Sequence, residues 1–376
     1  MPITRHPVLA ATLVLALFAL DSGTARAWTF NVEAASQVGQ TSRWAILEGG
    51  GWAKVEASQL QFYSADGLKL QSLNLKGNQF IVAPAGGRVL GVISYADPQP
   101  KNLNALAFEL YDANGQRLMR VDNPSFSSAI VAPNGNAFVG IDGAEGLPNS
   151  VLRFFDGHGN RRDTLAVERF EGGKYSRDGS RFFFMTAKEG LQVGGSDGTS
   201  PSQLGPADHW AASLDGRVVV VARGQEMSCF RDGKLISALT WRADTIPIRS
   251  LTVSPDGRHA AAITALHAAV FRTDSAAFLW DIAGNDPKWN FRSVDLRNGV
   301  SLVALGLDFD PGPDSADRHA FSRCDVYDRA GRLVHTEEDQ PERWGAFYPD
   351  VRFDETRGGV VLVSRDRFKF IKIGAS

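Results

Sequence analysis

The chain has 376 residues, of which 43% are hydrophobic, and its 40 basic and 42 acidic side chains give a formal net charge of −2. The hydrophobic share is ample for a buried core, which excludes an intrinsically disordered chain. The near-neutral charge gives no reason to expect nucleic acid or an anionic membrane as a partner.

The first 27 residues do not fit a folded domain. Arg5 and His6 make a modest basic start, residues 8–20 are an apolar run that is short for a membrane span, and Ala25-Arg26-Ala27 has the small-x-small pattern of a cleavage site. These features predict a signal peptide over residues 1–27 and a periplasmic or secreted protein. A membrane anchor is the alternative if cleavage fails, and after cleavage we expect no membrane association.

Two turn phrases alternate along the rest of the chain. The first is an apolar run, a turn such as Ser254-Pro255-Asp256-Gly257, and a second apolar run, and it recurs about every 44 residues. The second centres on Asp-x-x-Gly or a similar turn, as in residues 110–115. Asp-Gly and Asn-Gly supply the positive φ angles of tight hairpins, so each period holds two hairpins and four strands, named A to D. The turn glycines of the first phrase are Gly50, Gly86, Gly135, Gly179, Gly216, Gly257, Gly299 and Gly358.

Four strands in such a period make one blade of a β-propeller. The eight periods predict an all-β chain with a single propeller of eight four-stranded blades over residues 28–376. Seven blades are the alternative, because the first period is degenerate. The last period lacks its fourth strand, and residues 28–32 form a spare strand that we expect to pair with residues 368–373 and close the ring.

The segment Ser254-Pro255-Asp256-Gly257-Arg258 resembles WD40-like propellers, in particular the TolB-type repeat, whose signature is Ser-Pro-Asp-Gly before an apolar strand. Ser176-Arg177-Asp178-Gly179 and Ser213-Leu214-Asp215-Gly216 are similar but lack the proline. The resemblance implies a ring of blades around a central channel. It implies no active site, because a fold alone does not carry one.

The two cysteines, Cys229 and Cys324, are both predicted on strand C, in the fifth and seventh blades. A blade between them keeps their Cα atoms beyond the roughly 7 Å that a disulfide allows, so we expect two buried thiols. Residues 194–198 match the G-x-S-x-G nucleophile elbow of serine hydrolases. Because they fall on a predicted hairpin with no helix after it, we interpret them as a structural turn.

Tryptophans recur near the predicted connections from strand D to the next strand A. In a propeller, these D–A connections and the B–C connections share one face around the channel mouth, called here the loop-rich face. Aromatic and arginine side chains around a concavity are typical of binding sites, although aromatics between blades can also be plain core. The candidate residues for a partner- or ligand-binding face are Asp208, His209, Trp210, Arg242, Trp289 and Trp344.

The most acidic loop begins at Asp308. Its carboxylates could converge on calcium, and a solvated loop stiffened by Pro311 and Pro313 is the alternative. We expect no other cofactor, because the tryptophan spacing is irregular for a quinone-dependent propeller and the histidines follow no pattern of haem ligands. The candidate metal ligands are Asp308, Asp310, Asp314 and Asp317.

The sequence therefore predicts an exported monomeric propeller that acts as a scaffold. It would bind a protein, or a small-molecule or glycan ligand, on the loop-rich face. The alternative is a propeller enzyme, a lyase or hydrolase of glycans or peptides, with acid–base residues at the channel mouth. Its first candidates are Asp208, His209, Arg242 and Asp244.

Overall fold

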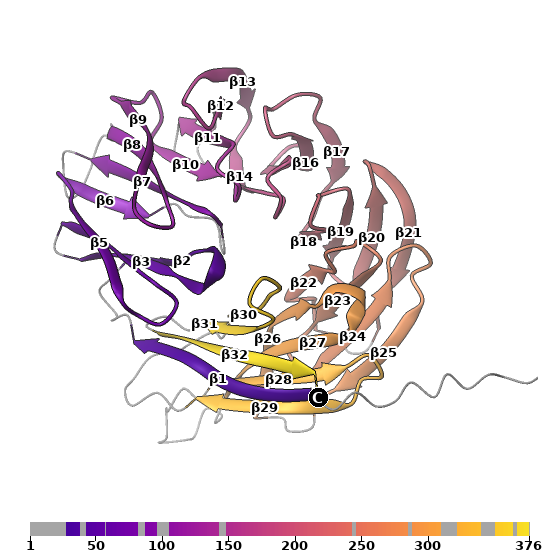
Figure 1. The fold of residues 1–376 in the computed structure, drawn as a ribbon. Coiled ribbons are helices and arrows are strands. Elements are labelled where there is room, and N and C mark those ends of the chain that lie inside the picture. The colour runs from indigo at the N-terminus through magenta and orange to yellow at the C-terminus, as the bar shows by residue number, and fades with distance from the viewer. Residues whose placement is uncertain are drawn as a thin grey trace, which may run out of the picture.

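The structure is a computed structural model that describes residues 28–37, 43–56, 58–81, 87–95, 105–142, 148–242, 246–284, 288–309, 322–339, 350–363 and 367–375. In these ranges, eight four-stranded antiparallel sheets lie in a ring (Figure 1). This confirms the all-β propeller and its eight blades. The predicted signal peptide lies outside the described residues. No helix within the described ranges is long and apolar enough to cross a membrane.

The first four blades take the strands in chain order. Blade 1 contains β2 (Arg43–Ile46), β3 (Trp52–Glu56), β4 (Gln59–Tyr63) and β5 (Lys69–Asn74), with the 3-10 turn η1 (Glu48–Gly50). Blade 2 contains β6 (Asn78–Ile81), β7 (Val89–Tyr95), β8 (Ala105–Asp112) and β9 (Arg117–Asp122). Blade 3 contains β10 (Ser128–Val131), β11 (Ala137–Asp142), β12 (Ser150–Asp156) and β13 (Arg161–Val167). Blade 4 contains β14 (Phe170–Tyr175), β15 (Arg181–Thr186), β16 (Gly190–Gly195) and β17 (Ser202–Gly205).

The next three blades follow the same order, and the last does not. Blade 5 contains β18 (His209–Ala212), β19 (Val218–Arg223), β20 (Glu226–Arg231) and β21 (Lys234–Thr240). Blade 6 contains β22 (Ser250–Val253), β23 (His259–Ile263), β24 (His267–Arg272) and β25 (Phe278–Ala283). Blade 7 contains β26 (Trp289–Leu296), β27 (Leu302–Phe309), β28 (Ser322–Asp328) and β29 (Leu333–Asp339), with η2 (Asn298–Val300). Blade 8 contains β30 (Asp350–Asp354), β31 (Gly359–Val363), β32 (Arg367–Ala375) and, as its outer strand, β1 (Trp28–Gln37).

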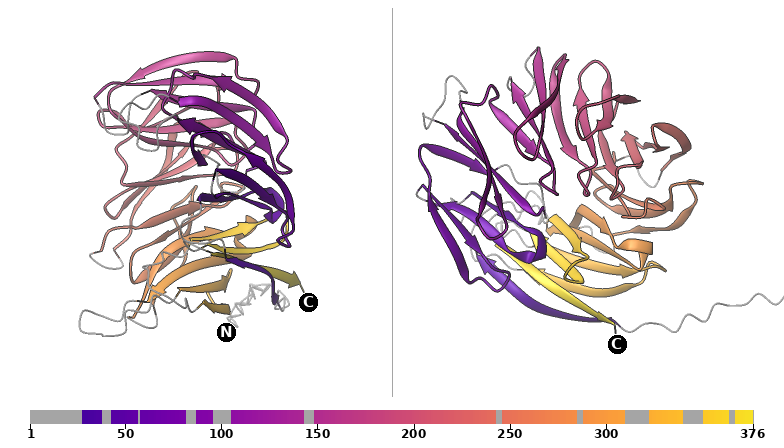
Figure 2. Two further views of the ribbon diagram at one scale, coloured as in Figure 1. Left: turned by 90° about the vertical axis from the view of Figure 1, so that its left-hand side faces the viewer. Right: turned by 45° about the horizontal axis from the view of Figure 1, so that its top comes forward.

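The ring is closed by strands from the two ends of the chain. β1 pairs antiparallel with β32, and Trp28 lies opposite Ala375 while Gln37 lies opposite Arg367. Figure 2 shows the indigo β1 and the yellow β32 side by side. The predicted closure is therefore confirmed, and the paired strand is longer than residues 28–32. The edge of β32 would otherwise be bare.

The repeated turn has a local physical cause. Asp256 Oδ1 accepts hydrogen bonds from the Ser254 hydroxyl (2.6 Å) and the Arg258 N–H (3.0 Å), and Ser254 Oγ accepts one from the His259 N–H (3.1 Å). Gly257 has a φ of 70°, which other residues adopt only with strain. The same bonds recur at Ser176 and Asp178 and at Ser213 and Asp215. The serine and aspartate bonds that shape the Ser-x-Asp-Gly turn between strands A and B are thus local in sequence.

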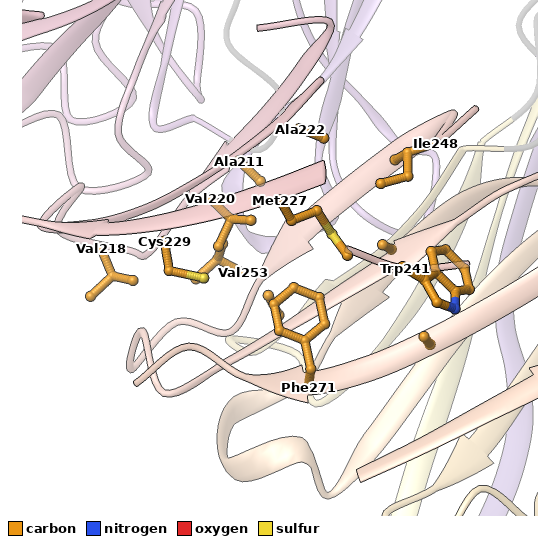
Figure 3. Packing of buried hydrophobic residues seen from close by; sticks show 13 residues of the cluster. Ala211, Val218, Val220, Ala222, Met227, Cys229, Trp241, Ile248, Val253 and Phe271 are labelled. Atoms are coloured by element: carbon orange, nitrogen blue, oxygen red, sulfur yellow. The ribbon is translucent and has the colours of Figure 1, made fainter. Parts of the chain in front are cut away.

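The core lies mainly between neighbouring blades. Figure 3 shows the cluster between blades 5 and 6, where Met227, Cys229 and Phe271 pack with Trp241. Cys229 and Cys324 are free and buried, in different clusters, as predicted. Residues 194–198 lie at the hairpin from β16 to β17, and no helix follows them, which confirms a structural turn.

Candidate functional site

The central channel is bridged near the A–B turns. Arg177, in the A–B turn of blade 4, donates through Nη2 to Asp295 Oδ1 of β26 at 3.0 Å. Two blades stand between blades 4 and 7 in the ring, so this ion pair reaches across the channel. Asp295 is 3% exposed and also accepts hydrogen bonds from the Thr252 hydroxyl (3.0 Å) and the Phe353 N–H (2.8 Å). One carboxylate therefore ties together four blades, and it is fully engaged in structural bonds.

The A–B turns also bond to one another around this end. The Asp178 N–H donates to the Leu214 carbonyl (3.0 Å), and the Leu214 N–H donates to the Pro255 carbonyl (3.1 Å). On the other side of blade 4, Asn134 Nδ2 donates to the Asp178 carbonyl (2.6 Å). These bonds tie the A–B turns of blades 3 to 6 to one another at this end of the channel.

A lysine and a tryptophan line the channel between blades 4 and 5. Lys174 Nζ lies 4.0 Å from the centre of the Trp210 ring, which is a cation–π distance. β14 is the innermost strand of its blade (Figure 1), and the Lys174 side chain is exposed. Burial by the channel walls, and secondarily the charge of Arg177, lower the pKa of Lys174 to about 8. The Lys174 side chain is nevertheless exposed to solvent. This lysine therefore has both a lowered pKa and a solvent-accessible amino group.

The residues before Trp210 have more ordinary partners. Asp208 Oδ2 accepts the Gly224 N–H at 2.7 Å, which pins the D–A connection to blade 5. Partial burial lowers the pKa of His209, and the nearby Asp208 opposes that shift. His209 is therefore neutral at pH 7. Trp210 itself packs on Phe183, with ring centres 4.9 Å apart.

A second aromatic–cation pair lies on blade 7. The Arg323 guanidinium carbon is 5.0 Å from the Trp289 ring centre, and Trp289 meets Phe309 edge-on at 5.4 Å. Trp289 is opposite Phe309 in the sheet, so it stands where strand A begins and strand B ends, on the loop-rich face. Asp308 accepts a hydrogen bond from Arg292 Nε at 2.6 Å. A cation at Asp308 would therefore compete with an existing ion pair.

Comparison with known proteins places the architecture. No family model matches the chain, and no curated protein matches it by sequence. BamB from Moraxella catarrhalis has a similar structure, with a TM-score of 0.54, 11% identity, and coverage of 92% of this chain and 100% of that one. A eukaryotic initiation factor has a TM-score of 0.51 at 11% identity, with coverage of 82% of this chain and 89% of that one. The propeller domain of Cps50 (Swd1) from Myceliophteria thermophila has a TM-score of 0.49 at 11% identity, with coverage of 92% of this chain and 99% of that one.

The fold is an eight-bladed β-propeller. Identities this low extend the likeness to the fold alone, so the site of this propeller rests on its own residues.

The propeller divides the sequence-predicted residues into three groups. Trp210, Trp289 and Asp308 lie near the loop-rich end of innermost or second strands, and Arg242 is exposed just after β21. Trp241, the neighbour of Arg242, is instead 3% exposed and donates from Nε1 to Asp281 Oδ2 at 2.9 Å, so it is core. Asp208 and His209 stand at the start of blade 5, and five further candidates lie outside the described residues: Asp244, Asp310, Asp314, Asp317 and Trp344.

Across the part of the chain that the structure describes, no group of three or more His, Cys, Asp or Glu side chains could hold a metal ion. The acidic loop after Asp308 falls outside that part, so the calcium hypothesis stays a prediction. Sequence reasoning missed Lys174, Arg177 and Asp295. Arg177 belongs to a recognised turn phrase, but nothing in that phrase indicates a partner in blade 7.

Proposed function

We propose that this protein is an exported propeller scaffold that binds a partner protein, or a small-molecule or glycan ligand, through its loop-rich face. The proposal is supported chiefly by two aromatic–cation pairs, Lys174 with Trp210 and Arg323 with Trp289. Both tryptophans lie where strand A begins, near the loop-rich face. Tryptophan and arginine are the residue types that most often dominate binding energy at interfaces. Both tryptophans are half-buried, so each is fixed by packing and still offers ring surface.

The bonding of the acidic groups favours binding over catalysis. Asp208 and Asp308 each have a close hydrogen-bond donor, Gly224 and Arg292 respectively. Asp295 in the channel already accepts from three donors. A general base needs a carboxylate free to take a proton from substrate. Asp308 and Asp295 are each held by an arginine, and Asp208, which accepts one backbone N–H, is the most available of the three.

The experiment uses tagged protein beginning at Trp28 as bait for cross-linked partners from the exported fraction. The face variant is Trp210→Ala with Arg242→Ala. The matched control carries Leu214→Ala with Arg258→Ala, two exposed residues of the A–B turns on the opposite face. A specific partner should be captured by the parent and the control and lost by the face variant. Equal capture by all three proteins would exclude this face.

Trp210 also packs on Phe183, so the face variant needs a check that it is folded. Arg242→Glu supplies a milder variant, because Arg242 is exposed and its replacement touches no core. It should weaken capture without changing the melting temperature. Export itself is tested by cell fractionation and by the N-terminal sequence of the mature protein, which we expect to begin at Trp28. Retention of the full chain in the cytoplasm would contradict export.

A further inference from the structure

A groove separates the outer parts of blades 1 and 2, away from the channel. It has a volume of about 1080 Å³, close to the upper end of the range of ligand sites. β5 of blade 1 forms one wall, and β8 and β9 of blade 2 form the other. The groove extends from the C–D turn at Gly115 to Asn123 beyond β9. It therefore follows the length of β8, about 26 Å at the usual rise per residue of a strand.

Two arginines are held in this groove by one buried carboxylate. Glu109 is 6% exposed, and its Oε1 accepts from Arg117 Nη1 (2.9 Å) and Arg120 Nη1 (3.0 Å). Arg120 Nε also donates to Asp122 at 2.7 Å. The two guanidinium side chains nevertheless remain 53% and 43% exposed. Their unused N–H groups are thus fixed in position and open to solvent, an arrangement suited to binding a carboxylate through two parallel bonds.

Blade 7 has a similar buried carboxylate paired with an arginine, but the described residues leave only a small cavity beside it. Asp325 precedes Tyr327 and the turn residue Asp328 just as Glu109 precedes Tyr111 and Asp112. Asp325 is also buried and paired with an arginine, Arg323, at 2.5 Å.

In blade 7 the surrounding space is filled. The cavity beside Asp325 measures only about 10 Å³, and Trp289 and Phe291 are among the residues that line it. Trp280 of the neighbouring blade packs near Tyr327, with ring centres 6.1 Å apart. The corresponding space between blades 1 and 2 is left open as the groove.

The rest of the lining narrows the class of ligand. Leu73, Leu75 and Leu106 supply aliphatic surface, and amide side chains come from Gln71, Asn74, Gln116 and Asn123. Among the described residues of the lining, Tyr111 is the one aromatic, and at 4% exposure it offers no ring on which a sugar or a base could stack. The lining carries Arg117, Arg120 and Lys76 against Glu109 and Asp122, so it is net positive. This charge, with the aliphatic patches, complements a peptide with apolar and acidic side chains.

We propose that this groove binds an extended peptide segment of a partner protein, with acidic side chains on Arg117 and Arg120 and apolar ones on the leucines. A strand-like peptide of about eight residues spans a groove of this length. The groove runs along the outer strands and meets the loop-rich face only at its end near Lys76 and Asn123. Its contacts with a peptide do not depend on the function proposed for that face.

The test measures fluorescence anisotropy of a labelled octapeptide of alternating leucine and glutamate with protein beginning at Trp28. Saturable binding is expected, with at least a tenfold loss in Arg117→Gln/Arg120→Gln. The matched control is Arg332→Gln, which removes an exposed arginine of the C–D hairpin of blade 7. It should bind like the parent. A peptide of alternating leucine and lysine should bind at least tenfold more weakly.

Four results would overturn the proposal. They are no saturable binding, equal binding of the lysine peptide, binding that survives the double variant, and tighter binding of an acidic oligosaccharide of similar length. If the double glutamine variant does not fold, Arg117→Lys/Arg120→Lys keeps both charges and removes the paired donors. That variant should still lose severalfold in affinity, and parent-like binding by it would count against the arginine contacts.

Discussion

Replacing Arg177 by methionine should destabilise the ring far more than breaking an exposed ion pair. The change leaves Asp295, which is 3% exposed, with a charge that has lost its counterion. Removing one partner of a buried pair typically costs about 3–5 kcal/mol. The pair is buried only on the side of Asp295, since the Arg177 side chain is 46% exposed, and Asp295 keeps its bonds from Thr252 and Phe353. We therefore expect a smaller loss of about 2 kcal/mol in the free energy of unfolding.

The decisive measurement is a double-mutant cycle with Arg177→Met, Asp295→Asn and their combination. In Asp295→Asn, the amide oxygen of the new side chain can still accept from the Phe353 N–H, so this single change should cost about 1–2 kcal/mol. We expect a coupling energy of about 1–2 kcal/mol between the two positions. Urea unfolding followed by tryptophan fluorescence supplies the four free energies.

The control cycle uses Arg272 and Asp274 on an outer turn of blade 6. Their atoms approach to 2.6 Å, closer than the 3.0 Å of the channel pair, but the side chains are 53% and 50% exposed. Coupling there should stay below about 0.5 kcal/mol, because solvent screens the charges. Equal coupling in the two cycles would refute the argument that burial, and not distance, determines the strength of the channel pair.

Three further predictions concern closure, the channel and the acidic loop. Deleting residues 28–37 should cost several kcal/mol, because it bares the edge of β32 and one face of blade 8, and an unchanged melting temperature would contradict this. The pKa of Lys174 is about 8 in the folded protein and about 10.4 in the unfolded chain. Between these two pH values the unfolded chain binds more protons than the folded protein does. The free energy of unfolding of the parent should therefore increase as pH rises from about 8 to about 10.5. Lys174→Met should abolish that increase. At pH 7 this variant should be more stable than the parent by about 1 kcal/mol, a value reduced for solvent access through the channel. Parallel pH profiles of stability for parent and variant would refute the assignment to Lys174. Calcium should raise the melting temperature of the parent much more than that of Asp308→Asn/Asp310→Asn, whereas a parent insensitive to calcium would remove the metal hypothesis.

The blades could be predicted because their turns are local. Asp256 and Ser254 make all the side-chain bonds of their turn within six residues of chain, so a short sequence motif is enough to specify it. The fourth strand of the last blade was predicted by a different argument. Without it, the edge of the last sheet would keep unpaired backbone N–H and C=O groups. Both arguments need only sequence spacing.

The candidate sites depend on distances that sequence spacing does not contain. Arg177 and Asp295 are 118 residues apart and meet because the ring curves. Trp241 and Trp210 look alike in the sequence, each beside charged residues, but one is 3% exposed and the other is half-buried along the channel. The arrangement around Glu109 did leave a signal, because Glu-x-Tyr-Asp at 109–112 matches Asp-x-Tyr-Asp at 325–328.

The closure of blade 8 places Trp28 and Ala375 where the other blades have a C–D hairpin. Trp28 sits opposite Ala375, so a short Asn-Gly linker could join them as an ordinary turn. A circular permutant joined there, and opened between β1 and β2, would keep every strand pairing while turning the longest-range contact of the chain into a local one. Its ring should close early in folding, because loop-closure entropy no longer opposes that pairing. In the natural order of strands, blade 8 is complete only after β1 has paired with β32, the last strand of the chain.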